Sequence, residues 1–285
     1  MMGGRRAGGE QAYYALQGSD VRLGGLSQRK RVDHCHMKLL LALLVAVPLS
    51  AQWVNYQSRD IPRTSTGEPD LSAPVPKSAT GKPDLSGTWG PINPPGVGIR
   101  RYFPADFQIP FLPAAAAVAA ARFQHVGVGD PAMHCLPKSI PYGMTNRIFQ
   151  LVQSPALTVI LYEEFYHYRL VFTDGRSHPK QMDPAWYGYS VGNWEGDDFV
   201  VETRGFNDKS WIDITGIPHS ESLRTIERFR RRDYGHMDVT ITLEDPETFQ
   251  RPWSFTIPIL ISPGNNVLED ICENERDLVH VVLDK

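Results

Sequence analysis

Apolar and polar residues alternate through the second half of the chain with the two-residue period of β-strands. In the clearest run, 237–244, Met, Val, Ile and Leu alternate with Asp, Thr and Glu. Successive side chains of a strand point to opposite faces, so this run has one buried and one wet face. Other extended runs, rich in Ile, Val, Leu, Tyr and Phe, lie at 147–152, 157–163, 165–172, 187–194, 199–205, 223–229 and 249–259. These runs predict a mainly β domain of about eight strands.

The predicted strands are nearly all joined by short turns with no helix between them. This up-and-down antiparallel connectivity closes most naturally into a β-barrel, and a β-sandwich is the alternative. One short helix is expected near 113–124, where Pro113 opens an alanine-rich run. Proline suits the first helical turn, and alanine has the highest helix propensity.

The segment Gly87-Thr88-Trp89 opens the first predicted strand. It resembles the opening Gly-x-Trp motif of the calycins, the group of lipocalins and fatty-acid-binding proteins, in which the tryptophan plugs one end of the barrel. The resemblance implies a lipocalin-like barrel.

The residues from Met37 to Ala51 have the pattern of a secretory signal peptide. A basic start, Met37-Lys38, precedes an apolar run that ends at Ser50-Ala51. That run is too short for a membrane helix of about 20 residues, and no cysteine follows it for a lipid anchor. We therefore expect an exported protein, periplasmic or extracellular, with no stable membrane span after cleavage. Residues 1–36 are then an upstream segment and 37–51 the signal peptide; a long basic leader or a membrane anchor is the alternative.

The next segment, 52–82, is rich in Pro, Ser and Thr and contains an imperfect repeat. Its two copies are 66–72, Thr-Gly-Glu-Pro-Asp-Leu-Ser, and 80–86, Thr-Gly-Lys-Pro-Asp-Leu-Ser. So polar a segment buries too little surface to offset the entropy of ordering. We interpret 52–82 as an extended linker, and 83–285 as a single barrel domain.

Two cysteines, Cys135 and Cys272, remain after the predicted signal peptide. In an oxidising compartment they suggest one disulfide. Closing so long a loop stabilises a fold by on the order of 4 kcal/mol in the chain-entropy model. Two separate buried thiols are the alternative.

Charge and motifs exclude several classes of function. The 29 basic and 32 acidic side chains among 285 residues give a net charge of -3, which argues against a nucleic-acid partner. No Gly-x-Ser-x-Gly, His-Glu-x-x-His or paired Cys-x-x-Cys motif occurs, and we predict no cofactor and no metal. A metal site assembled from His178, His219 and Asp213 is the alternative.

Strand parity gives the candidate polar site. Glu227 shares its parity with apolar neighbours, and Arg251 shares that of Phe249 and Trp253. A charge on the apolar face of a barrel must be paired or functional. We therefore expect Glu227 and Arg251 to meet inside the barrel, as a structural ion pair or as the polar handle for a ligand.

Other candidates are aromatic residues and a polar connection. Aromatic residues line pockets for apolar ligands, and the ligand-lining candidates are Trp186, Tyr189, Trp194 and Trp211. The connection 206–222 carries His219, Asp213 and Asp208, weaker candidates for a catalytic histidine assisted by a carboxylate.

From about residue 82 to 277 the chain resembles a family of exported bacterial proteins of the acidobacterial type, to which no activity is assigned. The matching segments are 81–89, 135–137, 160–163, 172–176, 188–192, 194–197, 205–208, 218–220 and 227–231. The resemblance implies an exported single-domain β protein.

The leading functional hypothesis is binding of a small, partly apolar molecule in the barrel. The alternatives are an isomerase or hydrolase that uses His219 with Asp213 or Asp208, and a cell-envelope interaction protein.

Overall fold

The computed structural model describes residues 61–272, apart from the side chain of Tyr166. The predicted upstream segment 1–36 and signal peptide 37–51 lie outside this range, as do 52–60 and 273–285. Within it, no helix has both the length and the apolar character needed to cross a membrane.

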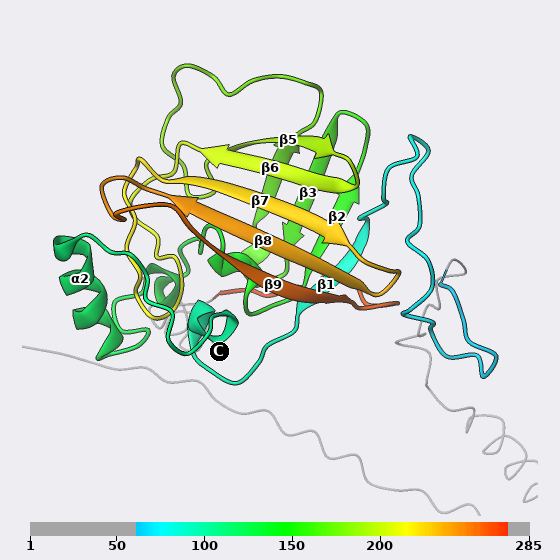
Figure 1. Cartoon of the computed structure of the whole chain (residues 1–285), viewed down its shortest axis with the longest axis horizontal. Coiled ribbons are helices and arrows are strands. Elements are labelled where there is room, and N and C mark those ends of the chain that lie inside the picture. The colour runs from blue at the N-terminus through cyan, green and yellow to red at the C-terminus, as the bar shows by residue number, and fades with distance from the viewer. Residues whose placement is uncertain (1–60, 273–285) are drawn as a thin grey trace, which may run out of the picture. The chain divides into compact units, whose positions relative to one another are not determined.

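Nine strands form a closed barrel (Figure 1). They are β1 Gly87–Pro91, β2 Phe149–Gln153, β3 Leu157–Tyr162, β4 Tyr168–Phe172, β5 Tyr189–Glu195, β6 Asp198–Arg204, β7 Arg224–Arg231, β8 His236–Glu244 and β9 Trp253–Ile261. β1 pairs with both β2 and β9 and so closes the sheet. The predicted mainly β barrel is confirmed. It has nine strands instead of about eight, because the strand with Gly-Thr-Trp is itself part of the wall.

The pairing of β4 with β5 departs from the expected up-and-down antiparallel pattern. These two strands run parallel and share only the pairs Val171↔Ser190 and Phe172↔Val191, whereas the other neighbours are antiparallel. Parallel neighbours require a long connection that returns the chain to the starting end of the sheet. Residues 173–188 make that return, and the short shared register leaves a seam in the barrel wall.

The inward side chains pack into one hydrophobic cluster. Trp89, Phe149, Phe199 and Phe229 are almost completely buried in it. The Trp89 indole donates a hydrogen bond to the Leu85 carbonyl at 2.9 Å, which anchors the ring beside the start of β1. Packed side chains fill the barrel interior, so clefts on the outside of the barrel are the candidates for a ligand site.

The described helices all lie in the connections between strands. The predicted alanine-rich helix is confirmed as α2, Pro113–Phe123, with Pro113 in its first turn. The four short 3-10 helices are η1 Gly98–Tyr102, η2 Pro131–His134, η3 Tyr142–Met144 and η4 Glu164–Tyr166.

Two connections tie the ends of the described chain to the barrel. The predicted disulfide is confirmed: Cys135 and Cys272 are bonded, with their Cα atoms 5.5 Å apart. At the other end, the amides of Tyr234 and Gly235 donate hydrogen bonds to the carbonyls of Ala73 and Leu71. Residues 71–73 of the predicted linker therefore lie against the β7–β8 turn.

Candidate binding site at the seam between β4 and β5

A buried ion pair lies inside the barrel beside the seam. Arg169, on β4, donates from Nη1 to Oε1 of Glu227, on β7, at 3.0 Å. Its Nη2 bonds the other carboxylate oxygen. Only 2% and 0% of the two side chains are exposed, so the pair is shielded from water and strongly coupled.

Two hydroxyls complete this polar cluster. Arg169 donates from Nε to Ser190 Oγ on β5 at 2.8 Å, and from Nη2 to Thr203 Oγ1 on β6 at 2.7 Å. The two hydroxyls lie 2.9 Å apart. Burial by itself lowers the pKa of Arg169, but the Glu227 carboxylate more than offsets this and raises it above its ordinary value. The guanidinium is therefore always charged, and Glu227 neutralises it.

The prediction that Glu227 meets Arg251 is wrong. Arg251 is exposed and precedes β9. Phe249, whose parity suggested an inward Arg251, belongs to the β8–β9 turn and forms an isolated bridge with Phe111. Strand parity therefore begins only at Trp253. The inward placement of Glu227 is correct, but its partner is Arg169.

A cleft of about 480 Å³ opens on the seam, where β4 and β5 cease to pair. Its wall is largely aromatic, and Arg169 and Ser190 of the polar cluster also line it. The lining residues are Pro137, His167, Tyr168, Arg169, Leu170, Phe172, Ala185, Trp186, Tyr187, Gly188, Tyr189 and Ser190. We call this space the seam cleft.

Ring contacts fix the aromatic wall. Phe172 and Tyr189 stack across the seam with centroids 5.1 Å apart, and the Arg176 guanidinium lies 4.0 Å from the Phe172 centroid. Deeper in, Tyr187 stacks on Tyr162 at 5.1 Å. Rings held in this way present rigid flat surfaces to a ligand.

Burial keeps Tyr162, Tyr187 and His167, beside the seam cleft, in their neutral forms at neutral pH. Burial raises the pKa of Tyr162 to about 12 and that of Tyr187 well above its ordinary value. Burial also lowers the pKa of His167 from 6.5. With Arg169 neutralised by Glu227, the seam cleft suits an uncharged ligand.

Backbone strain concentrates in the segments beside the seam cleft. Within residues 61–272, the non-glycine residues with positive φ are Cys135 at 62°, Ser139 at 64° and Phe165 at 58°. They flank Pro137 and His167 of the cleft wall. A partly buried ion pair between Lys138 and Glu164 joins the two strained segments. Strain of this kind gathers at binding and active sites, where the surrounding structure holds it in place.

The predicted aromatic residues do not gather at one site. Trp186 and Tyr189 line the seam cleft, whereas Trp194 lines a different cleft at the barrel end. Trp211 is buried, with the Arg122 guanidinium 4.7 Å from its ring centroid. Sequence reasoning missed Arg169, although its parity with Val171 in 165–172 was a signal for an inward arginine.

The weaker catalytic candidates are not brought together. His219 is buried, and its ring nitrogens bond Ser210 Oγ at 2.9 Å and the Ser220 carbonyl at 3.0 Å. Asp213 accepts hydrogen bonds from Ile99 and Thr215, and Asp208 is exposed. Among the described residues, no hydrogen bond or ion pair joins His219 to either aspartate, and no group of three side chains forms a metal site.

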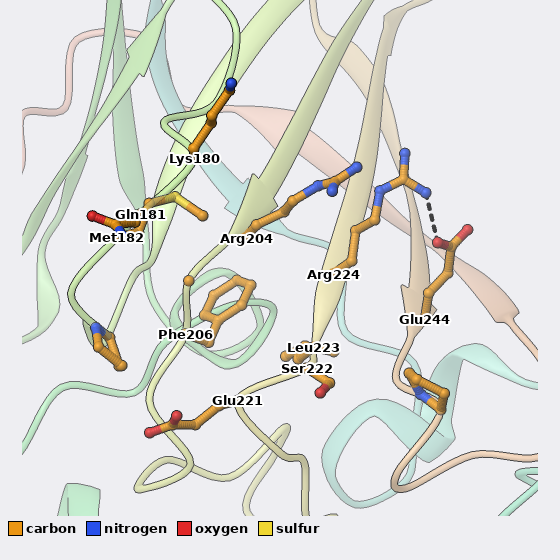
Figure 2. Close-up of a pocket in the computed structure, with 13 residues that line it drawn as sticks. Lys180, Gln181, Met182, Arg204, Phe206, Glu221, Ser222, Leu223, Arg224 and Glu244 are labelled. Atoms are coloured by element: carbon orange, nitrogen blue, oxygen red, sulfur yellow. Dashed lines mark hydrogen bonds and ion pairs between the residues drawn. The ribbon is translucent and has the colours of Figure 1, made fainter.

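Another cleft, of about 630 Å³, lies on the rim of the barrel where β6 ends and β7 begins (Figure 2). Phe206 lies at its centre, and Arg204 and Arg224 extend side by side above it. Both arginines are already paired, Arg224 with Glu244 and Glu202, and Arg204 with Glu202. An ion-pair network therefore forms part of its wall, and Phe206 is the one aromatic residue in the described lining.

This network makes the free energy of unfolding depend on pH in the acid range. Hydrogen bonds from Arg224, foremost, and Arg204 lower the pKa of Glu202 to about 2, below its ordinary 4.5. The stability that these ion pairs contribute is therefore fully present above pH 4.5 and is lost as the pH falls toward 2. Because the group is partly exposed, we expect Glu202→Gln to cost only about 1 kcal/mol.

Urea unfolding of wild type and Glu202→Gln across this pH range measures the effect. The stability difference should shrink as the pH falls. Glu221→Gln is the matched control, since Glu221 is exposed in the same cleft. A difference that stays constant down to pH 2 contradicts the assignment.

Comparison with protein-family models, curated proteins and solved structures gives no match to this chain. The resemblance to calycins and to exported bacterial proteins stays a prediction, and function is argued from the site itself.

Proposed function

We propose that the protein is an exported binding protein that holds a small, partly apolar molecule in the seam cleft. The observation that carries this proposal is the aromatic wall beside a fully paired polar base, Arg169 and Ser190. Ligand sites commonly combine an apolar lining with a few convergent polar groups, and the cleft's volume falls in their usual range. The disulfide supports export, since disulfides persist in oxidising compartments.

The chemistry of the cleft indicates the ligand class. The stacked rings around Tyr189 and Tyr187 favour a planar or aromatic group. The Ser190 hydroxyl at the base already bonds Arg169 and Thr203, and its one remaining hydrogen-bonding position suits a hydroxyl on the ligand. We infer an uncharged ligand, because a charge would have no counter-charge in the cleft. The isomerase or hydrolase alternative has no comparable support, since no hydrogen bond or ion pair among the described residues joins His219 to Asp213 or Asp208.

Trp186→Ala tests the proposal. Truncating a tryptophan that anchors a ligand costs about 2 kcal/mol or more, which weakens binding more than about tenfold. Native mass spectrometry of the full chain, purified from cells, should show a co-purified small molecule on the wild type, and this mass should be lost from Trp186→Ala.

Trp194→Ala is the matched control, because Trp194 is an equally large side chain in a different cleft. A molecule that stays on Trp186→Ala but leaves Trp194→Ala contradicts the seam assignment. A wild type that carries no molecule, and binds none from a panel of phenols and indoles, contradicts the proposed function.

A further inference from the structure

Each copy of the sequence repeat, together with the four residues before it, forms the same turn: 62–72 in the first copy and 76–86 in the second. In each copy a threonine or serine amide and an aspartate amide donate to the backbone across the turn. The bonds are Thr64 N to Glu68 O and Asp70 N to Pro62 O in the first copy, and Ser78 N to Lys82 O and Asp84 N to Pro76 O in the second. A glycine with positive φ, Gly67 or Gly81, takes the same place in each. The repeat is thus a structural unit used twice.

Side chains of the second turn bond the β5–β6 turn. Lys82 donates from Nζ to the Gly196 carbonyl at 2.9 Å, and Lys77 lies 3.3 Å from the Asp197 carboxylate. The residue of the first copy that corresponds to Lys82 is Glu68, which cannot donate such a bond. The second copy is therefore held over this end of the barrel by a lysine that the first copy lacks.

A cleft of about 550 Å³ lies between the second copy and the barrel end. We call it the end cleft. Its lining residues are Ser78, Ala79, Thr80, Lys82, Pro83, Gln153, Ser154, Pro155, Thr158, Thr173, Gly175, Gly192, Asn193 and Trp194. Thr158 and Gly192 are buried at this end of the barrel, and Trp194 packs on Phe199 with centroids 5.2 Å apart.

Charge distinguishes the end cleft from the seam cleft. Of the described residues that line it, Lys82 is the single charged one. Its ammonium bonds a neutral carbonyl, so no carboxylate in the cleft neutralises it. Apolar and small polar side chains form the remainder of the wall.

We propose that the end cleft is a second binding site, separate from the seam cleft, for an apolar molecule that bears one anionic group. The apolar body lies against Trp194 and the prolines, and the anion lies at the Lys82 ammonium. The lysine that holds the repeat in place thereby also selects the ligand. This site stands on observations independent of the proposed function.

Two fluorescent probes that differ by one charge test the site. They are 1-anilinonaphthalene-8-sulfonate, an apolar monoanion, and N-phenyl-1-naphthylamine, the same molecule without the sulfonate. Lys82→Gln should weaken binding of the anionic probe about fivefold, the size of a partly exposed charge pair. Binding of the neutral probe should be almost unchanged.

Three further variants locate the probes. Lys77→Gln removes the other lysine, which does not line the cleft, and should leave both affinities unchanged. Asn193→Trp places a large ring at an exposed position of the lining and should abolish binding of the anionic probe. Trp186→Ala, in the seam cleft, should leave binding of the anionic probe unchanged, which separates this site from the proposed function.

The proposal is overturned if the folded wild type binds neither probe at millimolar concentration, or if Asn193→Trp leaves binding of the anionic probe intact. If Lys77→Gln and Lys82→Gln lose equal affinity for the anionic probe, the assignment of the anion to Lys82 is overturned. Folding of each variant is checked by circular dichroism before titration.

Discussion

Glu227→Gln lowers the free energy of unfolding by about 3–5 kcal/mol, the expected cost of leaving one member of a buried ion pair without its counter-charge. The substitution preserves the shape of the side chain, removes the negative charge and replaces one acceptor oxygen by an amide NH2 group. Arg169 then stays buried and charged, bonded by the two hydroxyls and one amide oxygen but without a counter-charge. Guanidinium unfolding followed by tryptophan fluorescence measures the loss.

Two variants show whether burial is the cause. Arg228→Gln breaks ion pairs to Asp198 and Glu195 on the outside of the barrel, where 40% of the arginine side chain is exposed. Exposed pairs contribute up to about 1 kcal/mol. The double variant Arg169→Met/Glu227→Leu should be more stable than Glu227→Gln, because it leaves no unpaired charge. If Glu227→Gln costs no more than Arg228→Gln, the pair is not what holds this side of the barrel together.

Removing the disulfide gives the second large effect. The bond between Cys135 and Cys272 spans 137 residues of sequence. A cross-link over so long a loop stabilises by about 4–5 kcal/mol in the chain-entropy model. Cys135→Ser/Cys272→Ser should therefore unfold at a much lower denaturant concentration than the oxidised wild type.

The reduced wild type is the matched comparison. It should unfold with the double variant, because both lack the same cross-link. Equal stability of the oxidised and reduced wild types contradicts the prediction. Loss of two hydrogens by mass spectrometry confirms that the oxidised sample contains the bond.

Period-two alternation and residue composition predicted the strands, and the short turns between them predicted the barrel. The strands from β7 to β9 follow it closely, because each has one face in the hydrophobic cluster and one in water. Local helix propensity was enough to predict α2 from Pro113 and the alanines that follow it. The disulfide followed from two cysteines and an inferred oxidising compartment.

The seam could not be predicted from the same signals. Strand direction across 173–188 depends on where that connection packs, and its residues carry no periodic pattern. The partner of Glu227 depended on where β9 begins: an early start placed Arg251 inside, whereas the turn at 245–252 leaves it in solvent. Arg169 was accessible to parity reasoning, but its contact with Glu227 crosses the barrel interior between strands that are not neighbours.

Hydrogen–deuterium exchange of the full chain, with and without the molecule that co-purifies, tests the central claim most directly. Binding in the seam cleft should slow exchange in 167–172 and 185–190, the segments that supply its wall. Exchange at 78–83, beside the end cleft, should stay the same. Protection confined to 78–83 or to the rim around Phe206, with none at the seam, would contradict the account.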